Sequence, residues 1–264
     1  MKKLPVPAAV PFLLILLLAP RVLAQAARGP ATGDIVLGNV AGDLVRENTK
    51  GGFEAGRVKG KVDVTANGSI KLGRVDGSVN AVSNVGDIEI ASAAGAVSVR
   101  AQAGNISIGA AGGAAFAQAE MGEIRIRAAR SVEIRNIFGG DVKIAGVTGL
   151  TQVVTKGNIL LVAGPAAPGS VLCDLSSTEG DITLFLPADL AADLAIRTPF
   201  LEDPKRERQI QSEFKFGNFV QRCETGNIIT LAAKINGGGA RIDLYIEKGN
   251  IFIKRLGPGQ TVPF

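Results

Sequence analysis

Six basic residues are the strongest candidates for binding a ligand by charge. Arg125, Arg127 and Lys143 lie where apolar and polar residues alternate, and a second group lies in the polar stretch 199–213. The second group is Lys205, Arg206 and Arg208. Guanidinium and ammonium groups bind anionic groups, so both groups predict a surface for an anionic glycan, another polymer or a protein. Glutamates are interspersed with the first group, and pairing of opposite charges across neighbouring strands is the alternative explanation.

The sequence does not favour a metal or cofactor site. The 264-residue chain has no His and no Cys-x-x-Cys pair, so the usual nitrogen and sulfur ligand sets are missing. Calcium-binding β-rolls use a Gly-Gly-x-Gly-x-Asp spacing, and the paired glycines here do not have it. Asp follows Gly at five positions, which we interpret as outward and solvated: Asp34, Asp43, Asp87, Asp141 and Asp181. We therefore expect no cofactor and no bound calcium.

Carbohydrate cleavage remains an alternative to a purely binding role. Glycoside hydrolysis needs two carboxyl groups that converge on one bond, and it does not need His. Asp87, Asn105 and Glu123 recur at intervals of 18 residues, but this column contains an amide between its two acids. A charged, solvent-facing surface accounts for the column, so we expect no enzyme.

An N-terminal segment predicts export. Lys2 and Lys3 precede an apolar run, and Val22-Leu23-Ala24 supplies small residues before a cleavage site. These features predict a signal peptide over residues 1–24 and a linker over 25–32, with an uncleaved membrane anchor as the alternative. No Cys stands directly after the cleavage site, so a lipoprotein anchor is not expected, and no second apolar run is long enough to span a membrane. The mature chain is expected in the periplasm, at the cell surface or outside the cell.

Export also changes how charge and cysteine are interpreted. Cleavage removes three of the 29 basic residues and none of the 24 acidic residues, which leaves a net charge of +2. A nucleic-acid partner is therefore not expected. Cys173 and Cys223 could form a disulfide in an oxidising compartment or remain two apolar thiols.

A repeat of about 18 residues dominates the chain. Glycines recur about every nine residues from Gly33 to Gly122, and each begins a Gly-polar-apolar-polar-apolar strand. The second residue after alternate glycines forms a column of mostly Ile: Ile35, Phe53, Ile70, Ile88, Ile106, Ile124, Val142 and Ile159. The other glycines give a column of Val or smaller residues: Leu44, Val62, Val79, Val97, Ala115, Val132 and Thr151. We predict an all-β, single-domain β-solenoid, or β-helix-like fold, in which each coil has two strands and two corners.

The regular spacing ends after residue 161. A loop is expected over 164–169, followed by longer strands at 170–175, 181–186 and 193–198. We interpret residues 187–194 as a strand edge and turn rather than a helix, and 199–213 as a protruding loop or strand pair. Many Ala residues between Ala91 and Ala119 indicate a thin interior. The solenoid is expected over 33–255, with irregular C-terminal strands and a tail at 256–264.

The C-terminal motifs resemble a known family. The relevant segments are Gly180–Pro187, Ile235–Gly239 and Glu247–Lys254, together with the repeated Gly-[Asp/Asn/Ser]-[Ile/Val] strands. They are similar to the bacterial β-strand-repeat family of adhesin-like proteins, a domain family of unknown function. The resemblance implies a β-solenoid outside the cytoplasm with an adhesive or envelope-scaffold role, and it supplies no catalytic residues. The alternatives are a carbohydrate-binding or carbohydrate-cleaving β-helix and a partner in envelope stress or assembly.

Overall fold

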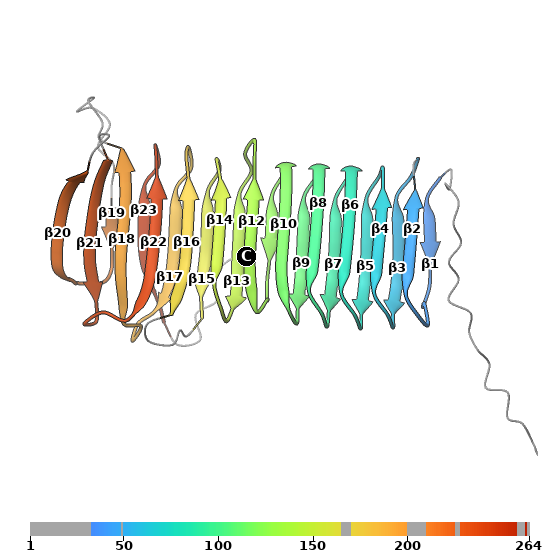
Figure 1. The fold of residues 1–264 in the computed structure, drawn as a ribbon, viewed down its shortest axis with the longest axis horizontal. Helices are drawn as coiled ribbons and strands as arrows, with labels where there is room; N and C mark the ends of the chain where they lie inside the picture. The colour runs from blue at the N-terminus through green and yellow to red at the C-terminus, as the bar shows by residue number, and fades with distance from the viewer. Residues whose placement is uncertain are drawn as a thin grey trace, which may run out of the picture.

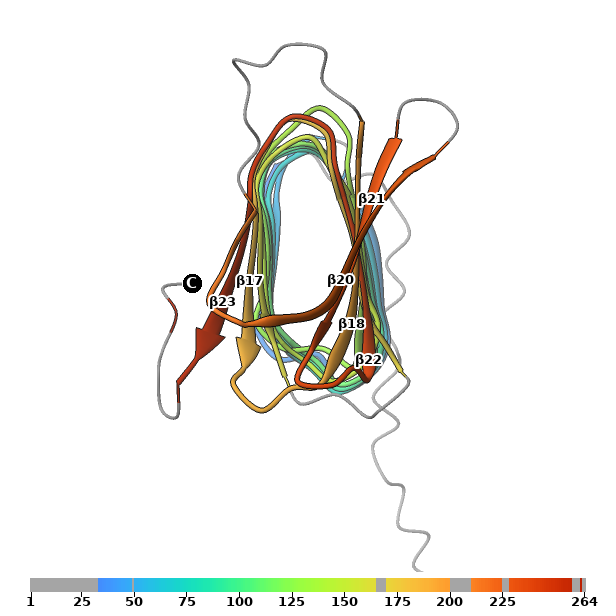
Figure 2. The same ribbon diagram turned by 90° about the vertical axis from the view of Figure 1, so that its left-hand side faces the viewer.

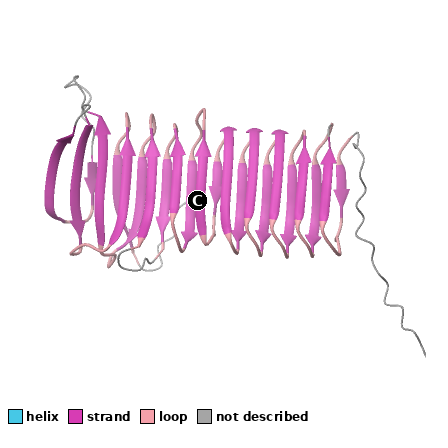
Figure 3. Cartoon of the chain, in the orientation of Figure 1, coloured by secondary structure: helices cyan, strands magenta, loops and turns pink. Residues whose placement is uncertain are grey.

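The computed structural model describes residues 33–48, 50–164, 170–199, 210–224, 228–257 and 262. Two long sheets face each other and form a rod, with short corners between the strands (Figures 1 and 3). No helix occurs among the described residues, so none there could cross a membrane. The signal peptide and linker predicted over residues 1–32 lie outside the described residues. Of the predicted tail at 256–264, only residues 256, 257 and 262 are described.

The first sheet has 11 strands, in this spatial order: β1 (Ile35–Leu37), β3 (Phe53–Val58), β5 (Ile70–Val75), β7 (Ile88–Ala93), β9 (Ile106–Ala111), β11 (Ile124–Ile126), β13 (Val142–Val147), β15 (Ile159–Ala163), β17 (Ile182–Pro187), β23 (Ile251–Leu256) and β19 (Ile210–Ser212). We call it the odd sheet. At a strand spacing of about 4.8 Å, its ten intervals make a rod about 48 Å long.

The second sheet has 12 strands: β2 (Leu44–Asn48), β4 (Val62–Ala66), β6 (Val79–Val85), β8 (Val97–Ala103), β10 (Ala114–Met121), β12 (Ser131–Asn136), β14 (Thr151–Thr155), β16 (Val171–Ser177), β22 (Ala240–Ile246), β18 (Ala192–Pro199), β21 (Ile228–Ile235) and β20 (Phe216–Glu224). We call it the even sheet. The pairing is parallel as far as β18, and the last two strands pair antiparallel.

The predicted 18-residue coil is confirmed. Ile88 is the register partner of Ile70 on one side and of Ile106 on the other, and all three side chains are buried. In the facing sheet, Val79 is paired with Val97 in the same way. Alternation along each strand therefore places one continuous column of Ile and one of Val in the interior, where β-branched side chains pack well on a pleated surface.

Glycine is required at the corners because successive coils approach closely there. Gly104 has φ of +148°, and a Cβ added to it would lie 2.2 Å from the carbonyl oxygen of Gly86. A Cβ at Gly122 would lie at the same distance from the oxygen of Gly104. Any larger residue would force these coils apart, which explains the regular recurrence of Gly.

The Asp and Asn residues after the corner glycines have a structural role that the sequence interpretation missed. Asp87 Oδ1 accepts the backbone N–H of Asn105 at 2.7 Å, and Asn105 Oδ1 accepts that of Glu123 at 2.8 Å. Asp181 Oδ1 accepts the N–H of Asn250 at 2.7 Å. Although these side chains are exposed or half-buried, they are not merely solvated. They link corner to corner along the rod and satisfy backbone donors outside the strand ladder.

Buried polar side chains satisfy carbonyl groups at the corners of successive coils. Asn48 Nδ2 donates to the oxygens of Gly33 and Gly52 at 2.8 and 2.9 Å. The hydroxyls of Ser83 and Ser177 each lie within hydrogen-bonding distance of two corner carbonyl oxygens, at 2.9–3.1 Å. An apolar residue at these positions would leave the carbonyl oxygens without these partners, which costs about 1–3 kcal/mol for a buried group.

The C-terminal strands do not follow chain order. β22 lies between β16 and β18, and β23 lies between β17 and β19, with parallel pairing on both sides. The chain therefore skips one level of the stack after β17, builds the end of the rod, and returns to fill the gap (Figure 1).

The end of the rod is closed by strands that turn across it. Figure 2 shows β20 passing over the mouth of the coil, and Phe214, just before β20, is 5% exposed. The guanidinium of Arg255 lies 5.0 Å from the centre of the Phe214 ring. The expected protruding segment at 199–213 is wrong in part, because Ile210–Ser212 forms β19 within the odd sheet. Residues 200–209 lie outside the described residues.

The fold also determines whether the two cysteines lie close enough for a disulfide. Cys173 is a free, fully buried thiol in β16, and Cys223 lies in β20. These strands are four places apart in the even sheet, or about 19 Å, which is too far for a disulfide within one molecule.

Ile88→Asp tests the interior column. The substitution places a carboxylate between Ile70 and Ile106 and should destabilise the protein by more than about 4 kcal/mol. The control Glu89→Lys changes an exposed side chain whose pairing with Lys71 spans 4.0 Å, and it should cost less than about 1 kcal/mol. Equal urea midpoints for the two variants would contradict the assigned strand facing.

Calcium should not change thermal stability. The corner Asp oxygens are engaged by backbone N–H groups, and no cluster of three potential metal-binding side chains occurs among the described residues. A ligand specific to the folded state would add about 2.7 kcal/mol at a hundredfold excess over its Kd. A melting temperature that rises in millimolar calcium and falls again with chelator would show that the corners do bind it.

Candidate functional site

The predicted basic surface lies on the outward face of the odd sheet. Arg125 on β11 is the register partner of Lys143 on β13, and Arg127 follows β11 as an exposed residue. Glu123 lies between the first two: its carboxylate accepts Arg125 Nε at 2.9 Å and Lys143 Nζ at 2.7 Å. Charge pairing, the alternative explanation, therefore accounts for Arg125 and Lys143.

The titration of Glu123 reflects this pairing. Partial burial acts to raise the pKa of the carboxyl, but hydrogen bonds from Lys143 and Arg125 outweigh it and hold the pKa below its usual range. Glu123 thus stays ionised and neutralises part of the basic group near neutral pH. The second predicted group, Lys205, Arg206 and Arg208, lies outside the described residues.

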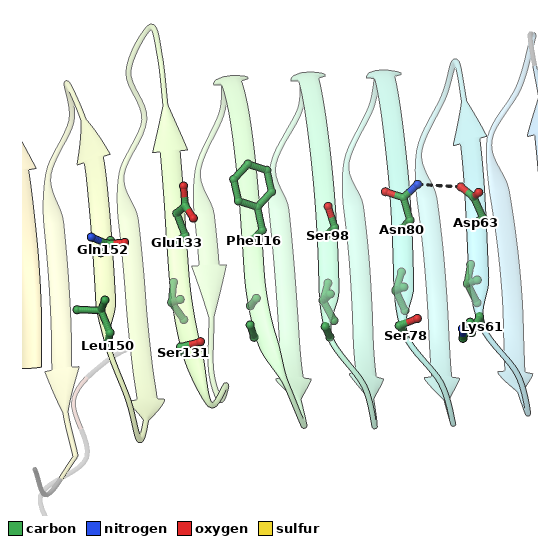
Figure 4. A pocket seen from close by; sticks show the side chains of 17 residues that line it. Lys61, Asp63, Ser78, Asn80, Ser98, Phe116, Ser131, Glu133, Leu150 and Gln152 are labelled. Carbon is green, nitrogen blue, oxygen red and sulfur yellow. Dashed lines mark hydrogen bonds between the residues drawn. The ribbon is translucent and has the colours of Figure 1, made fainter. Parts of the chain in front are cut away.

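A groove on the opposite face of the rod is a second candidate site. It crosses β4, β6, β8, β10, β12 and β14 at right angles to the strands, and encloses about 680 Å³ (Figure 4). Five strand spacings give it a length of about 24 Å along the rod. The groove is lined mainly by outward side chains of the even sheet, so the stacked coils determine its course.

Small side chains form the floor of this groove. Neighbouring coils place Ser78, Ala96, Ala114 and Ser131 in one outward column, because each precedes a residue of the interior Val column. Larger residues lie at the two ends, Lys61 and Leu150. A run of four short side chains between longer ones leaves a trough in the sheet surface.

Hydrogen-bonding groups and one aromatic ring form the adjacent outward column. Its members are Asp63, Asn80, Ser98, Phe116, Glu133 and Gln152. Asn80 Nδ2 donates to Asp63 Oδ1 at 2.8 Å, as Figure 4 shows. The half-buried Phe116 ring has the Arg100 guanidinium 5.8 Å from its centre, which is within the range of a cation–π contact.

The same column continues toward the capped end and brings two carboxylates together. A smaller hollow of about 140 Å³ shares Glu133 and Gln152 with the groove and reaches Asp174. Asp174 on β16 is the register partner of Asp243 on the inserted β22. Asp243 is 7% exposed and pairs with Arg241 Nε at 2.6 Å.

This arrangement is suited to binding a polyol. Hydroxyl, amide and carboxylate groups provide donors and acceptors, and an aromatic ring provides an apolar face, which is the combination that holds and orients a small polar ligand. The groove is open along its length, so it can accept a chain rather than a single compact molecule.

The sequence interpretation missed the groove for a specific reason. It attributed the Ala-rich stretch to a thin interior, which is correct for Ala115, Ala117 and Ala119. Ala96 and Ala114 instead occupy outward positions and form the floor. The available signal was Phe116, an aromatic residue at a polar position of the alternating pattern. The Asp174–Asp243 pair had no such signal, because the two residues are 69 apart and meet through the insertion of β22.

Comparison with known proteins adds no relatives. No family model matches the chain, and neither a curated protein nor a solved structure matches it. What is established is a β-solenoid of about 18-residue coils, and the resemblance to adhesin-like repeat proteins is supported only at the level of that fold.

Proposed function

We propose that this protein is an exported, non-enzymatic binding or scaffold protein of the cell envelope that holds an extended glycan in the groove of the even sheet. The observation that carries the proposal is the continuity of the groove across six neighbouring strands. The signal-peptide pattern at residues 1–24 supports export.

A repeating ligand fits the groove better than a compact one. Each strand adds one outward residue per column at intervals of about 4.8 Å, and every member of the column from Asp63 to Gln152 except Phe116 carries a hydrogen-bonding group. A polymer with a short repeat can make several weak contacts with such a surface, and these contacts add through multivalency.

The groove is preferred to the basic face for this role. Glu123 offsets the charge of Arg125 and Lys143, whereas the groove combines hydrogen-bonding side chains with the Phe116 ring. An anionic envelope polymer bound by Arg125, Arg127 and Lys143, or by Lys205, Arg206 and Arg208, is the competing version of the same function.

Carbohydrate cleavage is the second candidate function. The favouring observation is the pair Asp174 and Asp243, which share a register position on neighbouring strands at the end of the groove. Glycoside hydrolysis uses two carboxyl groups on opposite sides of the scissile bond. Here both acids lie on one face and Asp243 is paired with Arg241, so binding without cleavage is the stronger proposal.

Two matched serine substitutions test the groove. Ser98→Lys fills it, and Ser107→Lys makes the same change at an exposed outward position of β9 in the odd sheet. On an array of neutral and anionic polysaccharides, we expect Ser98→Lys to weaken glycan binding at least tenfold and Ser107→Lys to change it less than twofold. Phe116→Ala should weaken binding about fivefold, because ring stacking contributes about 1 kcal/mol.

The same array distinguishes the competing surfaces. Loss of binding on reversing Arg125, Arg127 and Lys143 to Glu, with Ser98→Lys unaffected, would move the site to the odd sheet. Loss on reversing Lys205, Arg206 and Arg208 alone would move it to the 199–213 segment. Release of reducing sugar from a bound glycan, abolished by Asp174→Asn, would replace binding with cleavage.

A further inference from the structure

The inserted C-terminal coil occupies a slot whose walls are built by earlier parts of the chain. β16 and β17 form one wall, and β18 and β19 form the other. Both walls present parallel strand edges, so the coil receives backbone hydrogen bonds from two sides in each sheet. Such a slot is an acceptor for added strands.

The contacts show how closely the slot fits its occupant. Five large apolar side chains of the coil are at most 2% exposed: Ile242, Leu244, Ile246, Ile251 and Ile253. At the corner, Asp181 Oδ1 accepts the N–H of Asn250 at 2.7 Å, and Ile182 N–H donates to the oxygen of Asn250 at 2.9 Å. The slot therefore recognises this sequence through its side chains as well as its backbone.

One short turn joins the coil to the rest of the fold. Residues 236–239 connect β21 to β22, and Asn236, Gly237 and Gly238 have positive φ, at 48°, 92° and 93°. Asn236 Nδ2 fastens the turn by donating to the oxygens of Ala188 and Leu190 at 3.1 and 2.9 Å. Among the described residues β22 and β23 come after every other strand in chain order, so this turn is the coil's one chain connection to the preceding strands.

We propose that the C-terminal coil, residues 240–256, exchanges between copies, so that two molecules of this protein are joined by filling each other's slots. The occupant is chemically identical to the segment that the slot already holds, so an exchanged pair keeps every strand contact seen in the single molecule. The exchanged pair differs from the single molecule in the turn at 236–238, which is closed in the single molecule and extended in the pair. Exchange of an identical element in this way is a low-cost route to a dimer, and it would link rods at their capped ends.

A disulfide between two cysteines introduced at register partners on β16 and β22 can detect the exchange. Ser176 on β16 faces Tyr245 on β22, and neither side chain is buried. With Cys173→Ala and Cys223→Ser removing the natural thiols, Ser176→Cys/Tyr245→Cys can form a disulfide across neighbouring strands. The bond lies within one chain in the unexchanged protein and between two chains in the exchanged pair.

A matched control uses a pair that exchange cannot separate. Gln152 on β14 faces Asp174 on β16, and both strands precede the slot. Gln152→Cys/Asp174→Cys in the same background should give only bonds within one chain. Both proteins are refolded over a hundredfold range of concentration with oxidised glutathione and examined on non-reducing gels.

We expect covalent dimers to increase with concentration for the 176/245 pair and to be absent for the 152/174 pair. Gly237→Ala gives a further test. The added Cβ would contact nothing within 4 Å, so it causes no clash, but the φ of +92° is unfavourable for any residue with a side chain. The substitution should raise the dimer fraction about fivefold or more by weakening the closed turn.

Three results would overturn the proposal. The first is bonds within one chain only, at every concentration and with Gly237→Ala. The second is equal dimer formation by the control pair, which would show non-specific oxidation. The third is a monomeric mass by light scattering for the refolded natural sequence and for Gly237→Ala at every concentration. None of these measurements depends on the glycan proposal, so the two proposals fail independently.

Discussion

Each strand of the regular coils depends on a strand from another coil for its ladder hydrogen bonds. The two strands of one coil lie in opposite sheets, so the ladder partners of Ile88 are residues about 18 positions away on either side. This constraint explains the repetition of the sequence. A coil that is wider or narrower than its neighbours would lose register with both of them. The interior therefore repeats a column of Ile facing a column of Val. The corners repeat Gly because a Cβ there would lie as close as 2.2 Å to a backbone oxygen of the neighbouring coil.

The same constraint leaves backbone hydrogen-bonding groups without ladder partners at the ends of the rod, because a terminal coil lacks a neighbour on one side. At the C-terminal end the chain reverses direction in β20 and β21 and lays Phe214 over the interior. At the other end of the described residues, Ile35 and Leu37 of β1 are only partly buried. The two ends therefore differ in kind. One is closed by irregular strands and locked by an inserted coil, whereas the other ends on regular parallel strands.

The sequence predicts the periodic contacts of this structure and does not predict the contacts that break the period. The Ile column is predicted residue by residue, because each member lies two residues after a corner glycine and these glycines recur about every 18 residues. The Asp residues after the corner glycines were placed correctly but interpreted as solvated, since sequence spacing does not show that Asp87 reaches the N–H of Asn105. The position of β22 could not be predicted, because a strand that returns to an earlier level has the same alternating pattern as one that continues the stack. The missed pair Asp174 and Asp243 is a direct consequence.

Alternation also separates what the fold requires from what a binding surface can use. Inward residues are constrained by the column they join, while outward residues of the same strand are free to differ from coil to coil. A groove along the rod needs short outward side chains in one column over several successive coils, which core packing does not demand. Ser78, Ala96, Ala114 and Ser131 satisfy that condition beside Phe116, while longer outward residues such as Lys61 and Leu150 bound the run. The interior column behind them holds Val79, Val97, Ala115 and Val132, so the fold is maintained whatever these outward residues are. Their agreement in size across four coils is therefore a property of the surface, and it is the strongest reason to regard that surface as the site of binding.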